Sequence, residues 1–278
     1  MGAKIVFYIF YGLISGLAEF LPVSPSAQGY LLTELTSLDT RHPLLLLMIH
    51  GASLAVVLIQ CRHRLGHMQR ELHLDWQPSG RRKRQPDRMT VLDGKFAIFA
   101  SVPAMALLAF SDVIYRKSDN LLWIALVLVV HGILLYIPQF QPSANRDSRH
   151  ISRLESVGLG LCAGASVIPG VSRMGAFLSV AALRGCERKY TLEIAFLTAI
   201  PALIMLILLD LISLLALGVA TISSTMLLFG CLTGVAAFGG AWLAMVIMRY
   251  LCAGDNYGSF AYYSWGLGLF SFILYLMV

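Results

Sequence analysis

Charged side chains are scarce in this sequence. Lys, Arg, Asp and Glu make up 13% of the 278 residues, whereas hydrophobic side chains make up 58%. Soluble domains carry about 25% charged residues, so the composition excludes an ordinary soluble domain. Most of the long apolar runs approach or exceed the roughly 20 residues that cross a bilayer; they are Pro43–Gln60, Phe96–Phe110, Leu121–Ile137, Ile194–Val219, Met226–Met248 and Tyr257–Val278. We therefore predict an all-α polytopic membrane protein, with about six transmembrane helices in a single domain over 1–278.

Cysteine is also rare, and acidic residues are fewer than basic ones. The five cysteines are odd in number and lack paired spacing, which argues against a disulfide framework or a zinc site. The net charge of +6 raises the question of a nucleic-acid partner. The positive charges gather in particular loops, which is typical of membrane topology instead. We expect the bilayer, and no nucleic acid, as the partner of this charge.

The basic residues predict which loops share a side of the membrane. Nine Lys and Arg lie in the basic loop 61–95, which the positive-inside rule places in the cytoplasm. Counting spans from there puts Ser111–Asp119 outside and Gln139–Glu155 inside. The N- and C-termini are then both external, and 16 of the 21 basic residues lie inside.

Two stretches contain helix breakers where a spanning helix would be continuous. Pro22 and Pro25 interrupt Lys4–Leu32, and Pro169 followed by glycine interrupts Val157–Leu183. The charge count works only if each stretch enters the membrane and returns to the same face. We predict two re-entrant helix–loop–helix hairpins that enter from opposite faces.

Opposed hairpins of this kind are typical of an inverted-topology repeat. Ser24 and Ser172 recur at matching places in the two stretches. We predict repeat one over about 1–138 and repeat two over about 155–278. Such repeats place a substrate site near the midplane, where broken helices meet.

Arg173 is the only charged residue in Val157–Leu183. An arginine at bilayer depth costs roughly 3 kcal/mol by insertion scales, so it usually faces a partner or a cavity. Its guanidinium suits phosphate oxygens, and the alternative is a structural salt bridge with Glu19. For Glu19, the alternatives to that salt bridge are a general base and a Mg²⁺ ligand.

The two loops also resemble anion sites built on helix N-termini. Ser24-Pro25 has the pattern of an N-cap followed by the first helical residue, and Ser172-Arg173 has a similar arrangement. Helix N-termini attract anions through backbone N–H groups. The predicted phosphate-binding residues are Ser24, Ser26, Ala27, Gln28, Ser172, Arg173 and Gly175. The serines have capping alone as the other interpretation. Ser15 and His50 are candidates to line the site, although a lone histidine in a span more often serves helix packing.

Gly16-Leu17-Ala18-Glu19-Phe20-Leu21-Pro22-Val23-Ser24 and Pro169-Gly170-Val171-Ser172-Arg173-Met174-Gly175-Ala176 resemble the two signature regions of the undecaprenyl-diphosphate phosphatase (bacitracin-resistance) family. The resemblance covers nearly the whole chain. It implies a bacterial inner-membrane enzyme that hydrolyses undecaprenyl diphosphate to the monophosphate on the external side, with a divalent cation, Mg²⁺ by expectation. The lipid carrier is thereby recycled for cell-wall synthesis. A homodimer is a further hypothesis.

By position, the resemblance assigns Glu19 to the second acid and Ser24 to the first serine of the first motif, and Ser172 and Arg173 to phosphate binding. The family motif runs roughly E/Q-x-x-x-E-F-L-P-V-S-S-T-G-H. Here Ser15, Pro25 and Gln28 replace an acid or amide, a serine and the histidine. Glutamine is no acid–base catalyst near neutral pH. We predict Glu19, Ser24, Ser26 and Arg173 as the catalytic set, with Ser26 or Ser24 attacking phosphorus.

Two other functions fit parts of the pattern. A polyprenyl-phosphate binding protein or flippase would use the same anion site without hydrolysis, in keeping with an inverted repeat and the replaced motif residues. A phosphatase of the phosphatidic-acid type has a P-S-G-H box that Pro25-Ser26-Ala27-Gln28 resembles, but the histidines of that class are absent here.

Overall fold

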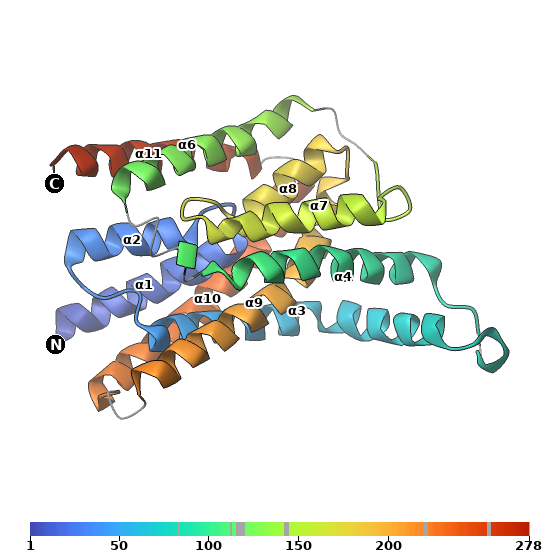
Figure 1. Cartoon of the computed structure of the whole chain (residues 1–278), viewed down its shortest axis with the longest axis horizontal. Helices are drawn as coiled ribbons and strands as arrows, with labels where there is room; N and C mark the ends of the chain where they lie inside the picture. Colours follow the sequence, from blue (N-terminus) through green and yellow to red (C-terminus); the bar gives the residue numbers. More distant parts are fainter. Residues whose placement is uncertain are drawn as a thin grey trace.

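A computed structural model describes residues 1–82, 84–111, 113–114, 120–141, 145–218, 222–254 and 257–277 (Figure 1). Within these ranges every named element is a helix, as the sequence predicts. The α-helices are α1 Gly2–Phe20, α2 Pro25–Thr36, α3 Pro43–Trp76, α4 Arg88–Leu108, α6 Leu121–Tyr136, α7 Arg153–Gly164, α8 Arg173–Leu183, α9 Arg188–Leu217, α10 Ser224–Ala253 and α11 Phe260–Met277. Seven helical segments in the described ranges are long and apolar enough to cross a membrane. The protein is an all-α polytopic membrane protein.

The two stretches with breakers form helix pairs that turn back on themselves. The chain breaks between α1 and α2 over 21–24, and between α7 and α8 over 165–172. Figure 1 shows the two pairs approaching each other from opposite ends of the bundle. At 19 residues, α1 is about 28 Å long by the helical rise, so it is longer than a short re-entrant arm. Re-entry into a bilayer, and the repeat boundaries, stay predictions.

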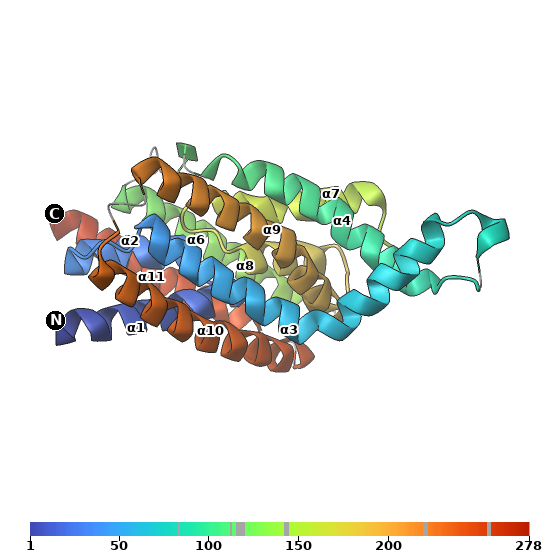
Figure 2. The same cartoon turned by 90° about the horizontal axis from the view of Figure 1, so that it is seen from below.

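The chain termini lie at one end of the bundle, and the connection between α3 and α4 lies at the other (Figures 1 and 2). This agrees with the relative sides given by the charge count; which end faces the cytoplasm stays a prediction. Of the external loop Ser111–Asp119, residues 112 and 115–119 lie outside the described part of the chain.

The prediction of a loop over 61–95 is wrong in detail. Helix α3 continues to Trp76 and α4 begins at Arg88, so most of this segment is a helical hairpin that extends beyond the bundle (Figure 2). The buried Glu71 carboxylate holds the hairpin together, because it accepts hydrogen bonds from Arg84 Nη1 at 3.0 Å and from the Asp87 amide at 2.8 Å. Lys95 pairs with Asp75 at 2.7 Å. Charge alone does not interrupt a helix when ion pairs of this kind stabilise it.

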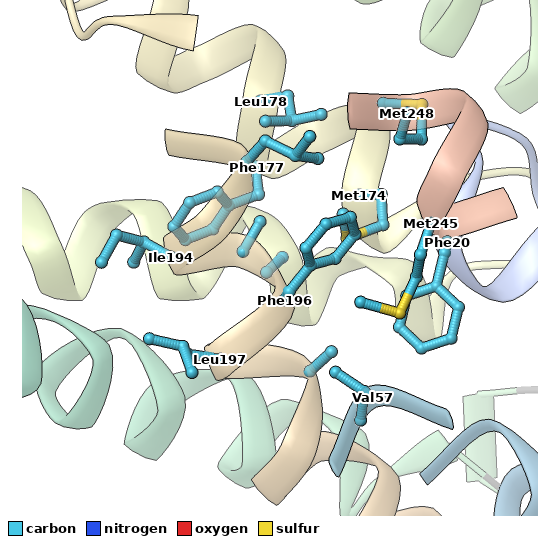
Figure 3. Packing of buried hydrophobic residues seen from close by; sticks show 14 of the residues in the cluster. Phe20, Val57, Met174, Phe177, Leu178, Ile194, Phe196, Leu197, Met245 and Met248 are labelled. Atoms are coloured by element: carbon cyan, nitrogen blue, oxygen red, sulfur yellow. The ribbon is translucent and has the colours of Figure 1, made fainter. Parts of the chain in front are cut away.

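Packing in the centre of the bundle fixes the residues next to the predicted site. Phe20, Met174 and Phe196 are fully buried, and the Phe20 and Phe196 rings meet edge to face with centroids 5.9 Å apart (Figure 3). Phe20 follows Glu19 in sequence and Met174 follows Arg173. The side chains that anchor α1 and α8 in the core therefore also hold the backbone of the two charged residues.

Two glycines one turn apart let α1 contact α10 closely. A Cβ added at Gly12 would lie 2.3 Å from the Thr233 carbonyl oxygen, and one at Gly16 would lie 2.1 Å from that of Ala237. Small residues at this spacing are typical of membrane helix pairs, because packing replaces the hydrophobic effect between helices in lipid. Any side chain at Gly16 would displace α1, and with it Glu19 one turn later.

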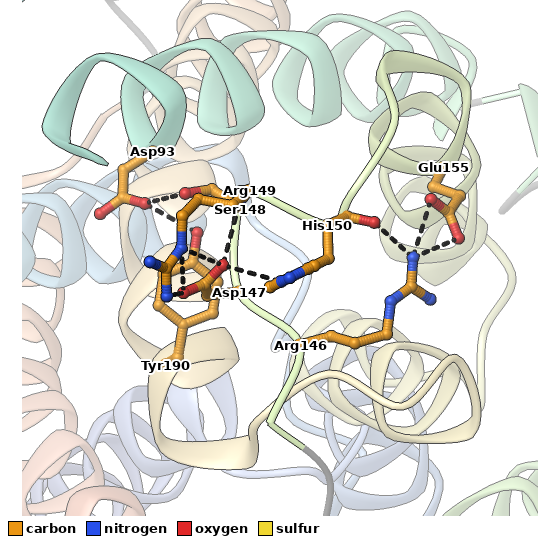
Figure 4. A network of polar contacts seen from close by, with 8 residues as sticks. All are labelled: Asp93, Arg146, Asp147, Ser148, Arg149, His150, Glu155 and Tyr190. Atoms are coloured by element: carbon orange, nitrogen blue, oxygen red, sulfur yellow. Dashed lines mark hydrogen bonds and ion pairs between the residues drawn. The ribbon is translucent and has the colours of Figure 1, made fainter. Parts of the chain in front are cut away.

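A polar network holds the start of α7 (Figure 4). Ser152 and Glu155 form a capping box, with the Glu155 amide donating to Ser152 Oγ at 3.1 Å and the Ser152 amide donating to Glu155 Oε2 at 2.9 Å. Arg184 Nη2 donates to Glu155 Oε1 at 2.6 Å, and Arg146 pairs with the same carboxylate at 3.2 Å. The Ser152 amide, followed by Arg184, lowers the pKa of Glu155 to about 2.

We expect the unfolding temperature of the purified protein to fall as pH is lowered from about 5 to about 2. An unpaired glutamate has a pKa near 4.3. Because folding lowers the pKa of Glu155, its stabilisation is present above the unfolded-state value and is lost as pH falls through about 2. Thermal unfolding in detergent across this window is the measurement. The unfolding temperature of Glu155→Gln should be lower than that of the wild type at pH 7 and should fall less between pH 5 and pH 2. An unchanged pH dependence would contradict the stabilising role of the Glu155 carboxylate. Asp147 contributes to the slope in both proteins, since Arg149 lowers the pKa of Asp147 to about 2.

Candidate active site

The tips of the two hairpins meet and exchange hydrogen bonds. The Gly170 amide donates to Ser24 Oγ at 3.1 Å, and Ser172 Oγ donates to the Leu21 carbonyl at 3.2 Å. Each serine also caps the helix that follows it, Ser24 for α2 and Ser172 for α8. The caps are those the sequence predicts, and the additional bonds tie the two tips to each other.

Gly170 is required at the second tip by its backbone conformation. Its φ of 107° lies in the region that side-chain-bearing residues rarely adopt, and an added Cβ would lie 2.7 Å from Val127 Cγ1 on α6. This conformation lets the Gly170 amide reach Ser24. The Pro169-Gly170 pair in the sequence thus sets the contact between the hairpins.

Glu19 and Arg173 form a buried ion pair where the tips meet. Arg173 Nη2 donates to Glu19 Oε2 at 2.8 Å, and the two side chains are 10% and 6% exposed. Arg173 Nε is buried and has no hydrogen-bond partner within the described residues. A buried unsatisfied donor costs about 1–3 kcal/mol, and more on a charged group. The ion pair therefore leaves one donor of the guanidinium without a partner among the described residues.

A second carboxylate reaches this cluster through His50. Asp210 Oδ2 on α9 lies 2.6 Å from His50 Nδ1, and His50 Nε2 on α3 lies 3.7 Å from Glu19 Oε1. The sequence leaves His50 either lining the site or serving helix packing. The structure places it beside Glu19, as the first of these requires. Sequence reasoning missed Asp210. Its signal is present nonetheless: it is the single acid inside the apolar run after Glu193, and an ionisable residue in a span marks a functional site by default.

Ser24 and Ser26 at the first tip differ in how many hydrogen-bonding positions of their hydroxyl groups are already used. Ser24 Oγ accepts from the amides of Ala27 at 3.3 Å and Gly170 at 3.1 Å, and it contacts Ser26 Oγ at 3.0 Å. A hydroxyl has two acceptor positions and one proton. With both acceptor positions used, Ser24 donates its proton to Ser26, so the Ser26 proton is available to another group. Ser24 is buried, whereas Ser26 is partly exposed.

The backbone donors predicted to bind phosphate are engaged in the helix starts. The Ala27 and Gly175 amides donate to the cap hydroxyls of Ser24 and Ser172, and the Gln28 amide donates to the Ser24 carbonyl at 3.3 Å. The prediction that the Ala27 and Gln28 amides at the start of α2 offer free N–H groups to an anion is therefore wrong. The cap serines satisfy them locally.

The chain matches the model of the bacitracin resistance protein BacA over residues 8–270. It belongs to this family. Relatives include undecaprenyl-diphosphatase 3 of Bacillus cereus, 28% identical over 95% of this chain and 94% of the relative. An undecaprenyl-diphosphatase of Nocardioides is 34% identical over 69% of each chain. One of Carboxydothermus hydrogenoformans is 26% identical over 95% of this chain and 94% of the relative.

Ser15, Pro25 and Gln28, the positions at which the resemblance implies replaced motif residues, have defined surroundings in this BacA-family chain. Gln28 Nε2 donates to the Tyr263 hydroxyl on α11 at 2.6 Å, so the glutamine ties α2 to α11. Ser15 is buried one turn before Glu19 on the same face of α1. Pro25 is the first residue of α2, where its missing N–H costs nothing.

His131, which lies outside the predicted site, supports the second tip. His131 Nε2 on α6 accepts from the Ser172 amide at 3.3 Å. A Cβ added at Gly175 would lie 2.9 Å from the His131 ring. Gly175 therefore makes room for His131, which accounts for a small residue there apart from any phosphate role. The catalytic and phosphate-binding roles assigned to the site residues stay predictions.

Proposed function

We propose that the chain is a polyprenyl-diphosphate phosphatase of the bacterial plasma membrane, with its termini external and its α3–α4 hairpin cytoplasmic. Its substrate is undecaprenyl diphosphate, and its products are the monophosphate and inorganic phosphate. The observation that carries this proposal is Arg173, which has an unpartnered Nε within the described residues and is held against Glu19. The same hairpin tip contacts Ser24 through the Gly170 amide. Relatives named undecaprenyl-diphosphatase over nearly the whole chain support it.

In the first step, Ser26 Oγ attacks the terminal phosphorus. The Oγ–P bond forms while the P–O bond to the lipid monophosphate breaks, and the monophosphate leaves with the electron pair. Glu19 takes the Ser26 proton. The hydrogen bond that Ser24 donates to Ser26 Oγ stabilises the developing negative charge there. In the second step, water attacks the phosphoserine, the P–Oγ bond breaks, inorganic phosphate leaves, and Ser26 regains a proton.

Arg173 stabilises negative charge on the phosphoryl group in both steps. Phosphoryl transfer depends mainly on positioning and charge stabilisation. The 2.8 Å contact with Glu19 fixes Nη2 and leaves Nε to meet a phosphate oxygen. Ser172 holds the start of α8, on which Arg173 is the first residue. The second hairpin thus delivers the guanidinium, and the first delivers the hydroxyl and the carboxylate.

The protein donors present do not form a metal cage. Among the described residues no group of three or more His, Cys, Asp or Glu side chains is arranged to hold an ion. Glu19 is already paired with Arg173. Mg²⁺ often binds through substrate phosphates with few protein ligands, so we propose that it arrives as the salt of the diphosphate. A ligand role for Glu19 stays a prediction, and we derive no step through the ion.

An apolar groove supports a lipid substrate. It has a volume of about 540 Å³ and lies between α3 and α10, lined by side chains that include Leu47, Met48 and Gly51 on one side and Gly234, Val235 and Phe238 on the other. Gly51 follows His50, which contacts the Glu19 cluster. An isoprenoid tail in this groove would lie close to the head-group site.

Binding or flipping of the lipid without hydrolysis is the second candidate function. The observation that favours it is the hydrogen bond from Gln28 to Tyr263, at a position where the resemblance implies a histidine. An amide there supplies hydrogen bonds and no acid–base chemistry. In this version the Arg173 cluster binds the head group and Ser26 remains unmodified.

We expect the purified protein to release inorganic phosphate from undecaprenyl diphosphate, and faster with Mg²⁺ than with EDTA. Release is measured in detergent over a range of lipid concentrations. Phosphate release by Glu19→Gln should be about 1% or less of the wild-type rate, because the proton acceptor is lost. The size-exclusion profile and unfolding temperature of Glu19→Gln show whether the variant is folded.

The outcomes separate the two functions. Release that survives Glu19→Gln identifies a contaminating phosphatase or a different base. No release by the wild type, together with tight lipid binding, supports the binding protein or flippase. Equal release in Mg²⁺ and EDTA contradicts the proposed cation.

A further inference from the structure

The buried Asp210 pairs with His50, which is 12% exposed, and the proposed reaction does not use this pair. Asp210 lies in the apolar part of α9 and is 8% exposed. Asp210 Oδ2 lies 2.6 Å from His50 Nδ1. A buried carboxylate in a span is costly, and such residues usually mark a functional path. A role limited to packing would be served better by apolar side chains, because replacing a buried ion pair by them is often neutral or stabilising.

Both oxygens of Glu19 face a nitrogen. Arg173 Nη2 contacts Oε2 at 2.8 Å, and His50 Nε2 faces Oε1 at 3.7 Å. Without the imidazole, the carboxylate would be held at one oxygen and free to rotate about that contact. With it, the plane of the carboxylate is set from two sides.

Asp210 determines the orientation of the His50 ring, because it contacts Nδ1. A carboxylate only accepts, so His50 Nδ1 carries the proton of the 2.6 Å hydrogen bond to Asp210. Glu19 Oε1 also only accepts, so Nε2 attracts it only when Nε2 carries a proton too, and the ring then acts as an imidazolium between the two carboxylates. A second group that fixes ring orientation in this way is typical of catalytic histidine sites. The charged groups that face His50 are Glu19 from α1, Arg173 from α8 and Asp210 from α9.

We propose that His50 and Asp210 are positioning residues for Glu19: Asp210 orients the imidazole, and the imidazole together with Arg173 holds the Glu19 carboxylate in its working orientation. This inference rests on the proposed hydrolysis. It assigns function to an acid from α9 and a histidine from α3, so that the five helices α1, α2, α3, α8 and α9 build one site. It also gives the chain an imidazole at Glu19, although the motif position at Gln28 has none.

The competing explanation is that the pair only ties α3 to α9. The chain offers a matched control for it, because Arg64 on α3 and Glu193 on α9 form an ion pair between the same two helices, with Arg64 Nη1 3.6 Å from Glu193 Oε2. Arg249 also donates to Glu193 at 2.9 Å. Glu193→Gln therefore weakens the helix contact without touching the site.

The test compares Asp210→Asn, His50→Gln and Glu193→Gln in phosphate release from undecaprenyl diphosphate, with kcat, KM and unfolding temperature measured for each. Asparagine preserves the shape of Asp210 but can present its amide either way, so the imidazole is no longer oriented. We expect kcat to fall about 10- to 100-fold in both site variants, with KM within about 3-fold of the wild type. Glu193→Gln should lower the unfolding temperature and keep kcat.

Wild-type kcat in Asp210→Asn and His50→Gln overturns the positioning role while the proposed function stands. A parallel fall of kcat and unfolding temperature in all three variants overturns it too, since a helix tie then explains everything. If Asp210→Asn does not fold, His50→Gln carries the comparison alone. No release by the wild type overturns the proposed function and this inference with it.

Discussion

Replacing Arg173 by alanine is expected to reduce phosphate release from undecaprenyl diphosphate by about 10³-fold or more. An arginine that stabilises a transferring phosphoryl group contributes about 10³- to 10⁵-fold in comparable reactions. Arg173 is buried beside Glu19, with Nε left without a partner within the described residues. Its loss removes the only basic side chain of Val157–Leu183. Lipid binding, measured by quenching or by retention in a pull-down with labelled lipid, should weaken in the same variant.

Loss of stability has to be separated from loss of function in this experiment. Removing one partner of a buried ion pair costs about 3–5 kcal/mol, because the other charge stays buried and unpaired. The double variant Arg173→Ala with Glu19→Gln removes both charges and should recover stability without activity. Arg173→Lys keeps the charge but loses the planar fork, and should recover only part of the rate.

A matched control is Arg249→Ala, since Arg249 donates to Glu193 at 2.9 Å outside the site. This variant should lower the unfolding temperature and keep kcat. Wild-type release by a folded Arg173→Ala would show that the Glu19–Arg173 contact is a structural salt bridge, which is the other interpretation of the pair.

Ser26→Ala is expected to reduce phosphate release by about 10⁴-fold or more, with an unchanged unfolding temperature. Removal of a catalytic nucleophile has an effect of this size or larger in well-studied hydrolases. The Ser26 hydroxyl is partly exposed and accepts from Ser24, so its own proton is not committed to a cap. Single-turnover assays with terminally labelled lipid should also show label on the wild-type protein and none on Ser26→Ala.

Ser24→Ala is the matched comparison and should behave in the opposite way. Ser24 Oγ serves the Ala27 and Gly170 amides, so its loss leaves two donors unsatisfied and costs about 1–3 kcal/mol. The unfolding temperature should fall, and the rate should fall less than in Ser26→Ala. If Ser24→Ala removes the label and Ser26→Ala keeps it, the two hydroxyl groups have the reverse roles.

The sequence contained enough to predict the two helix breaks and their caps. Ser24-Pro25 and Ser172-Arg173 carry local signals, because capping depends on residues a few positions apart. The meeting of Glu19 with Arg173 was an interpretation of a different kind, based on the cost of a lone charge in an apolar stretch. Glu19 is the expected partner of Arg173 because few carboxylates lie within the apolar stretches.

Apart from the Glu19–Arg173 pair, the contacts between distant segments were beyond sequence reasoning. His50 and Asp210 are 160 residues apart, and each by itself is an isolated polar residue in a helix. The exchange of hydrogen bonds between the tips depends on the φ of Gly170, which no residue pattern specifies uniquely. The density of charge over 61–95 favours a loop in the sequence, but charge alone does not end a helix, and Glu71 stabilises the helical hairpin there.

The tip-to-tip hydrogen bonds connect residues made far apart in time during translation. Ser24 and Gly170 are separated by 146 positions, and Ser172 and Leu21 by 151. The first hairpin therefore leaves the ribosome before the Gly170 amide that donates to Ser24 Oγ has been synthesised. Until the second hairpin has been synthesised and inserted, the nascent chain holds a carboxylate without its guanidinium, so catalytic competence is acquired late in biogenesis.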